Sequence, residues 1–224
     1  PLNFLYLNVP KEIPKEKSLA LVNPELASEW HMSKNNSMTP FDIVSFSHKK
    51  VWWKCDKGDD HEWEASVAHR SNGRSCPMCV GKKIVNSNCL ATINPDLASE
   101  WCQSKNGTLT PFDISPGTHK KFWWICNMGQ DHVWEASVAS RSTGNGCPIC
   151  AGQKVVTSNC LSTINPNLAS EWHSSRNGDL TPSEVGEGSS KKVWWKCEKG
   201  DDHEWVANIY NRSKGKGCPF CSGH

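Results

Sequence analysis

Hydrophobic and polar positions alternate with a period of two along the segment "KKVWWKC". Val51, Trp53 and Cys55 fall on one side of an extended chain, while Trp52 and the lysines fall on the other. After a short stretch with glycine and aspartate, "HEWEAS" continues in a second extended segment. Tryptophan and valine favour strands. The two segments are therefore predicted to form a β-hairpin.

Short capped helices are predicted on either side of this hairpin. In "NPELASEW", Asn23 is a suitable N-cap and the following proline fits the first helical position. Leu26 and Trp30, four residues apart, then share one helical face. Thr39 begins "TPFDI", which is typical of a capped single turn, and Ser66 can cap one further turn after the hairpin. All helices are expected to be short.

The whole pattern occurs three times. Trp30, Trp101 and Trp172 are 71 residues apart, with no insertion or deletion between the repeated landmarks. Such a fixed period indicates a repeat protein. The predicted repeats comprise residues 18–88, 89–159 and 160–224.

Residues 1–17 are predicted to form an N-terminal strand and a linker. Leu2, Phe4 and Tyr6 alternate as in a strand, and "PKEIPKEK" is typical of a charged linker punctuated by proline. Because the sequence begins with Pro1 rather than methionine, we expect it to be a fragment of a larger polypeptide.

Each repeat contains the spacing C-x5-H-x14-C-x2-C. Three thiolates and one imidazole form a closed tetrahedral shell, as in structural zinc sites, and leave no position for a substrate water. Buried thiols without metal, or disulfides, are the alternatives, but chance does not explain two spacings kept three times. We predict three structural zinc ions per chain. The predicted ligands are Cys55, His61, Cys76, Cys79, Cys126, His132, Cys147, Cys150, Cys197, His203, Cys218 and Cys221.

Three cysteines remain outside this pattern, namely Cys89, Cys102 and Cys160. An odd remainder favours a reducing, intracellular compartment, which is the cytoplasm, or the nucleus or virion for a eukaryotic or viral source. Cys102 stands where the other repeats have His31 and His173, and packing at the end of a helix is preferred over metal ligation there. No apolar segment approaches the ~20 residues of a membrane span.

The motifs "LASEW", "WW", H-x-W and "GCPIC" or "GCPFC" resemble those of a family of tandem zinc-ribbon or treble-clef domains. The resemblance implies small α+β zinc-binding domains, each with a short helix, a β-hairpin and two zinc knuckles. Ser75 departs from the family pattern, since the other repeats have glycine there. The spacing between the glycine and the histidine of "KGDDH" or "MGQDH" is also two residues longer than in the family pattern. Such domains occur in bacterial and large-DNA-virus proteins, some beside restriction-type endonuclease domains, which implies a role in nucleic-acid transactions.

Charge and composition exclude two classes of function. The formal net charge is +2, and zinc binding to three thiolates per site lowers it to about −1. A globally basic polyanion binder is therefore excluded, and any nucleic-acid contact must come from local patches. No enzymatic activity is expected, because the zinc shells are closed and no D/E-x-K motif is present.

One local patch repeats on the lysine side of the first strand. An indole between lysines can stack on a base while the ammonium groups contact phosphates; alternatively, the "NPELASEW" helix covers this indole. The candidates are Lys50, Trp52, Lys54, Lys121, Trp123, Lys192, Trp194 and Lys196. The repeated Arg70, Arg141 and Arg212 are further candidates, for which capping of carbonyls or pairing with glutamate is the alternative.

Two functions are compatible with these patterns. The first is a non-catalytic module that positions a larger protein on nucleic acid, DNA rather than RNA. The second is a protein-interaction or architectural array in which the repeated tryptophans anchor a protein partner.

Overall fold

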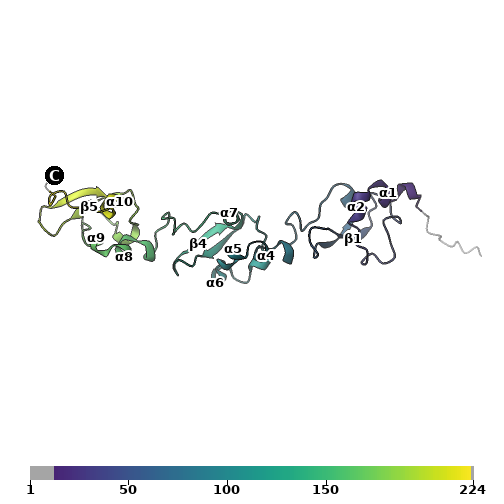
Figure 1. Ribbon diagram of the computed structural model, residues 1–224, viewed down its shortest axis with the longest axis horizontal. Helices are drawn as coiled ribbons and strands as arrows, with labels where there is room; N and C mark the ends of the chain where they lie inside the picture. Colours follow the sequence, from purple (N-terminus) through teal and green to yellow (C-terminus); the bar gives the residue numbers. More distant parts are fainter. Residues whose placement is uncertain (1–12, 223–224) are drawn as a thin grey trace, which may run out of the picture. The chain divides into compact units, whose positions relative to one another are not determined.

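The computed structural model describes residues 13–222, so the predicted N-terminal strand lies outside the described residues (Figure 1). Two compact units are distinguished. Within the described residues, one contains residues 13–98 together with Leu109–Gly117, and the other contains Ser99–Thr108 together with residues 118–222. The first repeat lies within the first unit and the third repeat within the second unit. The division passes through the second repeat.

Each repeat has two short helices, a hairpin and a third short helix in the same order, and the second repeat adds a further short helix before its hairpin. In the first repeat these are α1 (Leu19–Val22), α2 (Pro24–Ser28), β1 (Lys50–Lys54), β2 (Glu62–Ser66) and α3 (Val67–Ser71). The second repeat contains α4 (Leu90–Ile93), α5 (Pro95–Ser99), α6 (Gln103–Asn106), β3 (Lys121–Ile125), β4 (Val133–Ser137) and α7 (Val138–Ser142). The third repeat contains α8 (Leu161–Ile164), α9 (Pro166–Ser170), β5 (Lys192–Lys196), β6 (Glu204–Asn208) and α10 (Ile209–Ser213). Short 3-10 turns are η1 (Lys15–Lys17), η2 (Asn86–Asn88), η3 (Pro111–Asp113), η4 (Thr157–Asn159) and η5 (Pro182–Glu184).

The centre of each repeat is a two-stranded antiparallel sheet, as the alternation predicts. In β1–β2, Val51 pairs with Ala65 and Trp53 with Trp63. Val51 and Trp53 are buried, Trp52 is half-buried, and the terminal lysines are exposed. The strands β3–β4 and β5–β6 have the equivalent register. One face of each hairpin therefore belongs to the core, and the other, which we call the outer sheet face, carries Trp52 or its equivalent.

The chain after α2 covers the inner tryptophan of the strand. Trp30 packs edge-on against Trp53 with ring centroids 5.8 Å apart, and its indole N–H donates to the carbonyl of Met38 at 3.1 Å. Trp172 and Trp195 form the same pair at 5.5 Å in the third repeat. The alternative in which this helix covers Trp52 is therefore wrong, because its tryptophan packs against the adjacent, inner ring.

The free edge of β1 is covered by the backbone of residues 29–31 and by one side chain. The amide of Lys54 donates to the carbonyl of Glu29 at 2.7 Å, and the amide of His31 donates to the carbonyl of Trp52 at 3.1 Å. The amide of Trp52 donates to Asn35 Oδ1 at 2.8 Å, and Asn35 Nδ2 donates to the carbonyl of Trp52 at 2.9 Å. Asn106 and Asn177 make the same two bonds to Trp123 and Trp194. Because these bonds satisfy backbone groups at an open edge, they protect the hairpin from pairing with another strand.

A buried arginine ties the end of the short helix to the hairpin. The guanidinium of Arg70 lies 5.3 Å from the Trp53 ring and 5.2 Å from the Trp63 ring. It also pairs with Glu29 and donates to the carbonyl of Arg74. Arg141 and Arg212 are equally buried and pair with Glu100 and Glu171. The glutamate of "LASEW" and the repeated arginine are thus one structural pair.

Local capping fixes the turn that follows each hairpin. Ser66 Oγ accepts from the amide of His69 at 3.3 Å, as predicted for an N-cap. Ser137 and Asn208 cap α7 and α10 in the same way, at 3.2 Å in both cases. The cap places α3 directly before the Cys76 knuckle.

Loss of this cap should weaken the repeat measurably. Ser66→Ala is expected to lower the free energy of unfolding by about 1 kcal/mol, the usual contribution of an N-cap. Urea unfolding followed by tryptophan fluorescence would measure the change. Ser66→Asn is the matched control, because the third repeat uses asparagine at this position, and it should retain parental stability. Equal losses from both variants would contradict the capping role.

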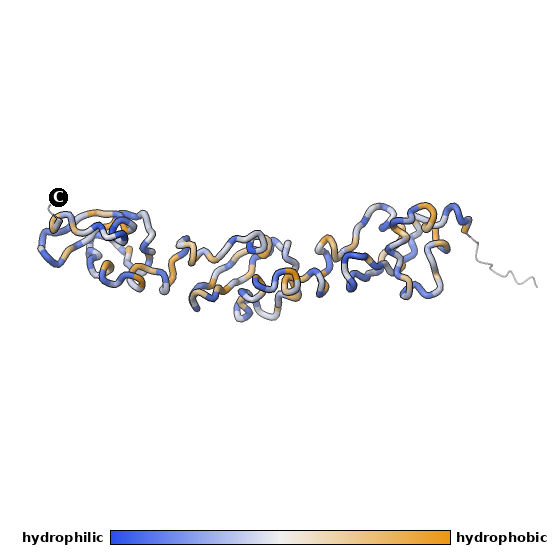
Figure 2. Tube along the Cα trace, in the orientation of Figure 1, coloured by the Kyte–Doolittle hydropathy of each residue, from blue (hydrophilic) through white to orange (hydrophobic). Residues whose placement is uncertain are grey.

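Hydrophobic positions are distributed in short stretches along the coloured part of the trace (Figure 2). Within residues 13–222, no helix has both the length and the apolar character that crossing a membrane requires. The core of the first repeat instead combines smaller side chains with three indoles, those of Trp30, Trp53 and Trp63, and Leu19, Trp53 and Val67 have no exposed surface. A core of this size is marginal for a domain of about 70 residues, which is the range where a structural metal commonly contributes to stability.

Candidate metal centres

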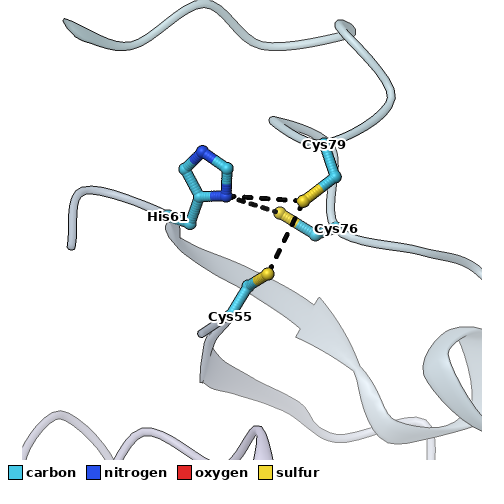
Figure 3. Close-up of side chains that lie close together, drawn as sticks. All are labelled: Cys55, His61, Cys76 and Cys79. Carbon is cyan, nitrogen blue, oxygen red and sulfur yellow. Dashed lines mark hydrogen bonds between the residues drawn. The ribbon is translucent and has the colours of Figure 1, made fainter. Parts of the chain in front are cut away.

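The four predicted ligands of each repeat lie together. In the first repeat, Cys55 follows the last residue of β1, His61 precedes β2, and Cys76 and Cys79 follow α3 (Figure 3). One ligand atom from each of the four residues lies within 4.8 Å of the others, and the equivalent groups in the second and third repeats meet the same limit. The sheet positions one half of the site and the capped α3 turn positions the other.

The distances between ligand atoms match a zinc tetrahedron. Zn–S bonds of about 2.3 Å and Zn–N bonds of about 2.0 Å place tetrahedral ligands about 3.5–3.8 Å apart. Cys55 and Cys79 Sγ are separated by 3.5 Å, and His61 Nδ1 lies 3.7 Å from Cys76 Sγ and 3.5 Å from Cys79 Sγ. The second repeat gives 3.3–3.8 Å for the equivalent pairs. The residues therefore fit zinc, with His Nδ1 as the nitrogen ligand.

The crowded thiols also favour a bound cation. Burial, together with the neighbouring Cys55 and Cys76 thiols, raises the pKa of the Cys79 thiol to about 12. The same causes raise the pKa of Cys150 to about 12 and that of Cys221 to about 11. A thiol with such a pKa does not ionise at neutral pH unless a metal ion stabilises the thiolate. The donor set of three sulfurs and one nitrogen is typical of zinc.

A glycine makes room for each histidine ring. A Cβ atom added at Gly129 would lie 2.7 Å from His132 Cδ2, and one added at Gly58 or Gly200 would lie 2.8 or 2.7 Å from the equivalent ring. Real Cβ atoms do not approach a ring carbon so closely, so the glycine in "KGDDH" and "MGQDH" is needed for the position of the ligand. The longer spacing noted in the sequence therefore retains the ligand geometry.

The segment after each knuckle supports the metal site from outside. Ser87 donates through its amide, at 2.9 Å, and through its hydroxyl to Asp60, the neighbour of His61. These bonds, the hydroxyl bond first, lower the pKa of the Asp60 carboxyl. In the second repeat, Ser158 bonds to Asp131 and lies 3.1 Å from His132 Nε2. Partners around a metal ligand fix its orientation, as this serine does for the histidine.

Closed sites of three cysteines and one histidine, each built from a hairpin and a following knuckle, define a class of small structural zinc domains. The chain belongs to the family described as "Probable Treble clef zinc finger domain", which matches residues 26–82, 97–153 and 168–224. The resemblance noted in the sequence motifs is thereby confirmed, as are the α+β class and the three zinc sites. No curated protein matches the chain.

The outer sheet face contains the predicted lysines and tryptophans. Lys50, Lys54, Lys121, Lys192 and Lys196 are exposed. Each outer tryptophan is half-buried and carries a cation over its ring. Lys34 Nζ lies 4.7 Å from the Trp52 centroid, Lys105 Nζ lies 4.2 Å from that of Trp123, and Arg176 Cζ lies 4.6 Å from that of Trp194. These three cations come from the segment before the strand, and the sequence interpretation did not include them.

The three repeated arginines do not lie on this face. Arg70, Arg141 and Arg212 are 93–94% buried between tryptophan rings, so phosphate contact, one of the two roles considered for them, is the wrong one. Pairing with glutamate and bonding to a carbonyl, the alternative, is what the structure contains. The guanidinium needs burial on both sides by rings from two strands, and only the folded hairpin provides it.

Cys102 of the second repeat stands where the other repeats have a histidine, and the residues around that histidine differ between the repeats as well. In the first repeat, His31 Nε2 lies 3.0 Å from Glu62, and Lys34 and Lys54 also contact this carboxylate. The bond from Lys34, followed by that from His31, lowers the pKa of Glu62 to about 2. The third repeat has the same cluster around Glu204.

The second repeat replaces this charged cluster with apolar residues. Cys102, Ile125 and Val133 stand where the first repeat has His31, Lys54 and Glu62. Cys102 is buried, and it belongs to none of the metal-binding groups found among residues 13–222. The cysteine is therefore the apolar counterpart of a charge-paired histidine.

Proposed function

We propose that the three zinc domains form a non-catalytic module that attaches a larger protein to nucleic acid, with DNA as the preferred partner. The observation that supports this proposal is the cation on each outer tryptophan. The cation changes identity, from Lys34 to Lys105 to Arg176, but it remains within 4.2–4.7 Å of the ring. All three repeats thus have a positive charge beside an indole, and sites that bind single-stranded nucleic acid use this combination.

The stacked cation can exchange with a base. An exposed cation–π contact contributes about 0.5–1 kcal/mol, whereas stacking of a base on an aromatic ring contributes about 1–3 kcal/mol. A base that takes the place of Lys105 on Trp123 therefore gains free energy. The displaced ammonium remains beside the ring, where it can contact the adjacent phosphate. The strand residue Lys121, which is exposed, supplies a second positive charge on the same face.

The three faces are not equivalent in charge. Glu62 and Glu204 neutralise part of the first and third faces. Lys105, in contrast, makes no ion pair with any residue in the described part of the chain. Glu135, which pairs with Trp123 across the hairpin, is a carboxylate on this second face, but it makes no ion pair with Lys105 among the described residues. We expect the second repeat to contribute most to attraction of phosphate, because its lysine is not paired.

Removal of the three outer rings tests the proposal. Trp52→Ala, Trp123→Ala and Trp194→Ala together are expected to reduce affinity for oligothymidine or a DNA duplex by at least about 100-fold, because each lost stack contributes about 1–3 kcal/mol. Fluorescence anisotropy would measure affinity, and elemental analysis would verify three zinc ions. Phe41→Ala with Phe112→Ala is the control, since these exposed aromatics lie outside the outer sheet face.

A second pair of variants keeps the rings and so avoids any effect on folding. Lys50→Gln with Lys192→Gln should reduce the slope of log affinity against log salt by about 1.4 on single strands. If the parental chain binds neither oligothymidine nor duplex DNA, the proposal is wrong. If the lysine variants leave the slope unchanged, phosphates are not bound at this face.

A protein partner is the second candidate, favoured by a different surface. Phe41 and Phe112 are 54% and 62% exposed at equivalent positions beside α1 and α4. The third repeat has Ser183 there, whose hydroxyl lies 3.0 Å from that of Ser162. Exposed aromatic side chains are enriched at protein interfaces. In this alternative, the double phenylalanine variant would lose the partner while the tryptophan variant would retain it.

A further inference from the structure

A groove in the first repeat carries positive charge that the shared fold does not require. It has a volume of about 530 Å³ and lies between β2, the α3 turn and the second knuckle. His69, Arg74 and Lys82 bring positive or protonatable groups to it, and Pro77 and Val80 form an apolar part of the wall. None of the residues that line it is acidic. The groove shares no residue with the outer sheet face.

The charged groups of this groove are free to bind a ligand. His69, Arg74 and Lys82 are all exposed, and none of the ion pairs within residues 13–222 involves them. The only paired cation is Arg70 in the floor, whose charge is offset by Glu29. Groups of like charge repel one another, and no carboxylate lines this groove to offset the repulsion. An anion in the groove would offset it.

The other repeats show that these cations are not needed for folding. At the positions of His69, Arg74 and Lys82, the second repeat has Ser140, Asn145 and Gln153. The second repeat nevertheless forms the same hairpin, capped turn and metal site. The third repeat has Asn211 and retains a cation only at Lys216 among the described positions. The fold therefore forms with neutral residues at these positions. Because the first repeat nevertheless has three cationic or protonatable residues there, we assign them a role in binding.

We propose that this groove is a second DNA-binding site, specific to the first repeat, which contacts the phosphodiester backbone. Arg74 and Lys82 would bind phosphate oxygens, for which guanidinium and ammonium groups are the usual donors. Pro77 and Val80 would contact the apolar face of the adjoining sugar or base. A volume of about 530 Å³ falls in the range of sites that accept a nucleotide-sized group. The inference rests on the proposed function for its partner but uses a different set of residues.

Exchange of residues between repeats tests the groove. Arg74→Asn with Lys82→Gln gives the first repeat the residues of the second repeat at two of the three positions, so the fold and three zinc ions should be retained. The salt slope for oligothymidine should fall by about 1.4, and affinity at moderate salt should fall about tenfold. The reciprocal change, Asn145→Arg with Gln153→Lys, should increase the salt slope by a similar amount. Lys15→Gln with Lys17→Gln removes the same charge elsewhere and should have a much smaller effect.

Each outcome separates the groove from the outer sheet face. If the triple tryptophan variant binds DNA as the parent does while the groove variant does not, the groove proposal stands and the role of the tryptophans fails. If the charge control weakens binding as much as the groove variant, the groove has no special role. If polyaspartate or a phosphoserine peptide competes as well as oligothymidine, the site binds anions generally or an acidic protein, and the proposal is overturned.

Discussion

Cys147→Ser is expected to reduce the zinc content of the chain from three ions to two and to unfold the hairpin of the second repeat. A structural zinc ion contributes on the order of 10–16 kcal/mol in small domains, more than a core of this size provides. Serine lacks the thiolate, so the shell of Cys126, His132 and Cys150 cannot close. Native mass spectrometry would count the ions, and hydrogen exchange would locate the unfolded segment in β3–β4.

The chain supplies its own control for this change. Cys102→Ser alters a buried cysteine of the same repeat that lies outside the metal-binding group, so zinc content should stay at three. The outer repeats should keep their metal in Cys147→Ser, because no ligand is shared between repeats. Simultaneous loss of all three ions would show that the repeats fold as one cooperative domain, which contradicts the interpretation of independent sites.

Arg70→Met is expected to lower the free energy of unfolding of the first repeat by about 3 kcal/mol. Removing one partner of a buried ion pair usually costs about 3–5 kcal/mol, and the lower value applies because Glu29 is one-third exposed. The change also removes two cation–π contacts, to Trp53 and Trp63. Faster hydrogen exchange of the β1–β2 amides, with slow exchange preserved in β5–β6, is the measured signature.

Arg74→Asn is the comparison, since this neighbouring arginine is exposed and contributes only its carbonyl to the pair. It should leave hydrogen exchange unchanged. If Arg70→Met keeps the parental exchange rates but weakens DNA binding, the structural role assigned to Arg70 is wrong. Arg70 would then be a nucleic-acid contact.

Features set by short spacings were predictable from the sequence. The zinc ligands, the capped turns and the inward and outward sides of the strand depend on local geometry, and comparison of three repeats inside one chain distinguished pattern from chance. The partner of Arg70 was not predictable in this way. Glu29 lies 41 residues before it, and the two rings that enclose it come from different strands. Such contacts exist only after the chain has folded.

One signal was present in the sequence and was not used. Asn35, Asn106 and Asn177 recur every 71 residues, as regularly as the tryptophans. An asparagine kept in an otherwise variable polar loop indicates a specific backbone contact, and here it completes the edge of the strand. Lys34, Lys105 and Arg176 share only their charge, so comparison by residue identity missed them. Comparison by charge would have placed the cation beside the outer tryptophan.

The bond between Ser87 and Asp60 has a consequence for how the chain can be divided. The matched family segments end at residues 82 and 153, before Ser87 and Ser158. Asn88 and Asn159 also lie beyond those ends, and each bonds to two carbonyls around the preceding knuckle. What looks like a spacer between two fingers is therefore the last component of the finger before it. When fingers are exchanged by recombination or engineering, a cut of the chain after Asn88 or Asn159 therefore leaves each finger complete.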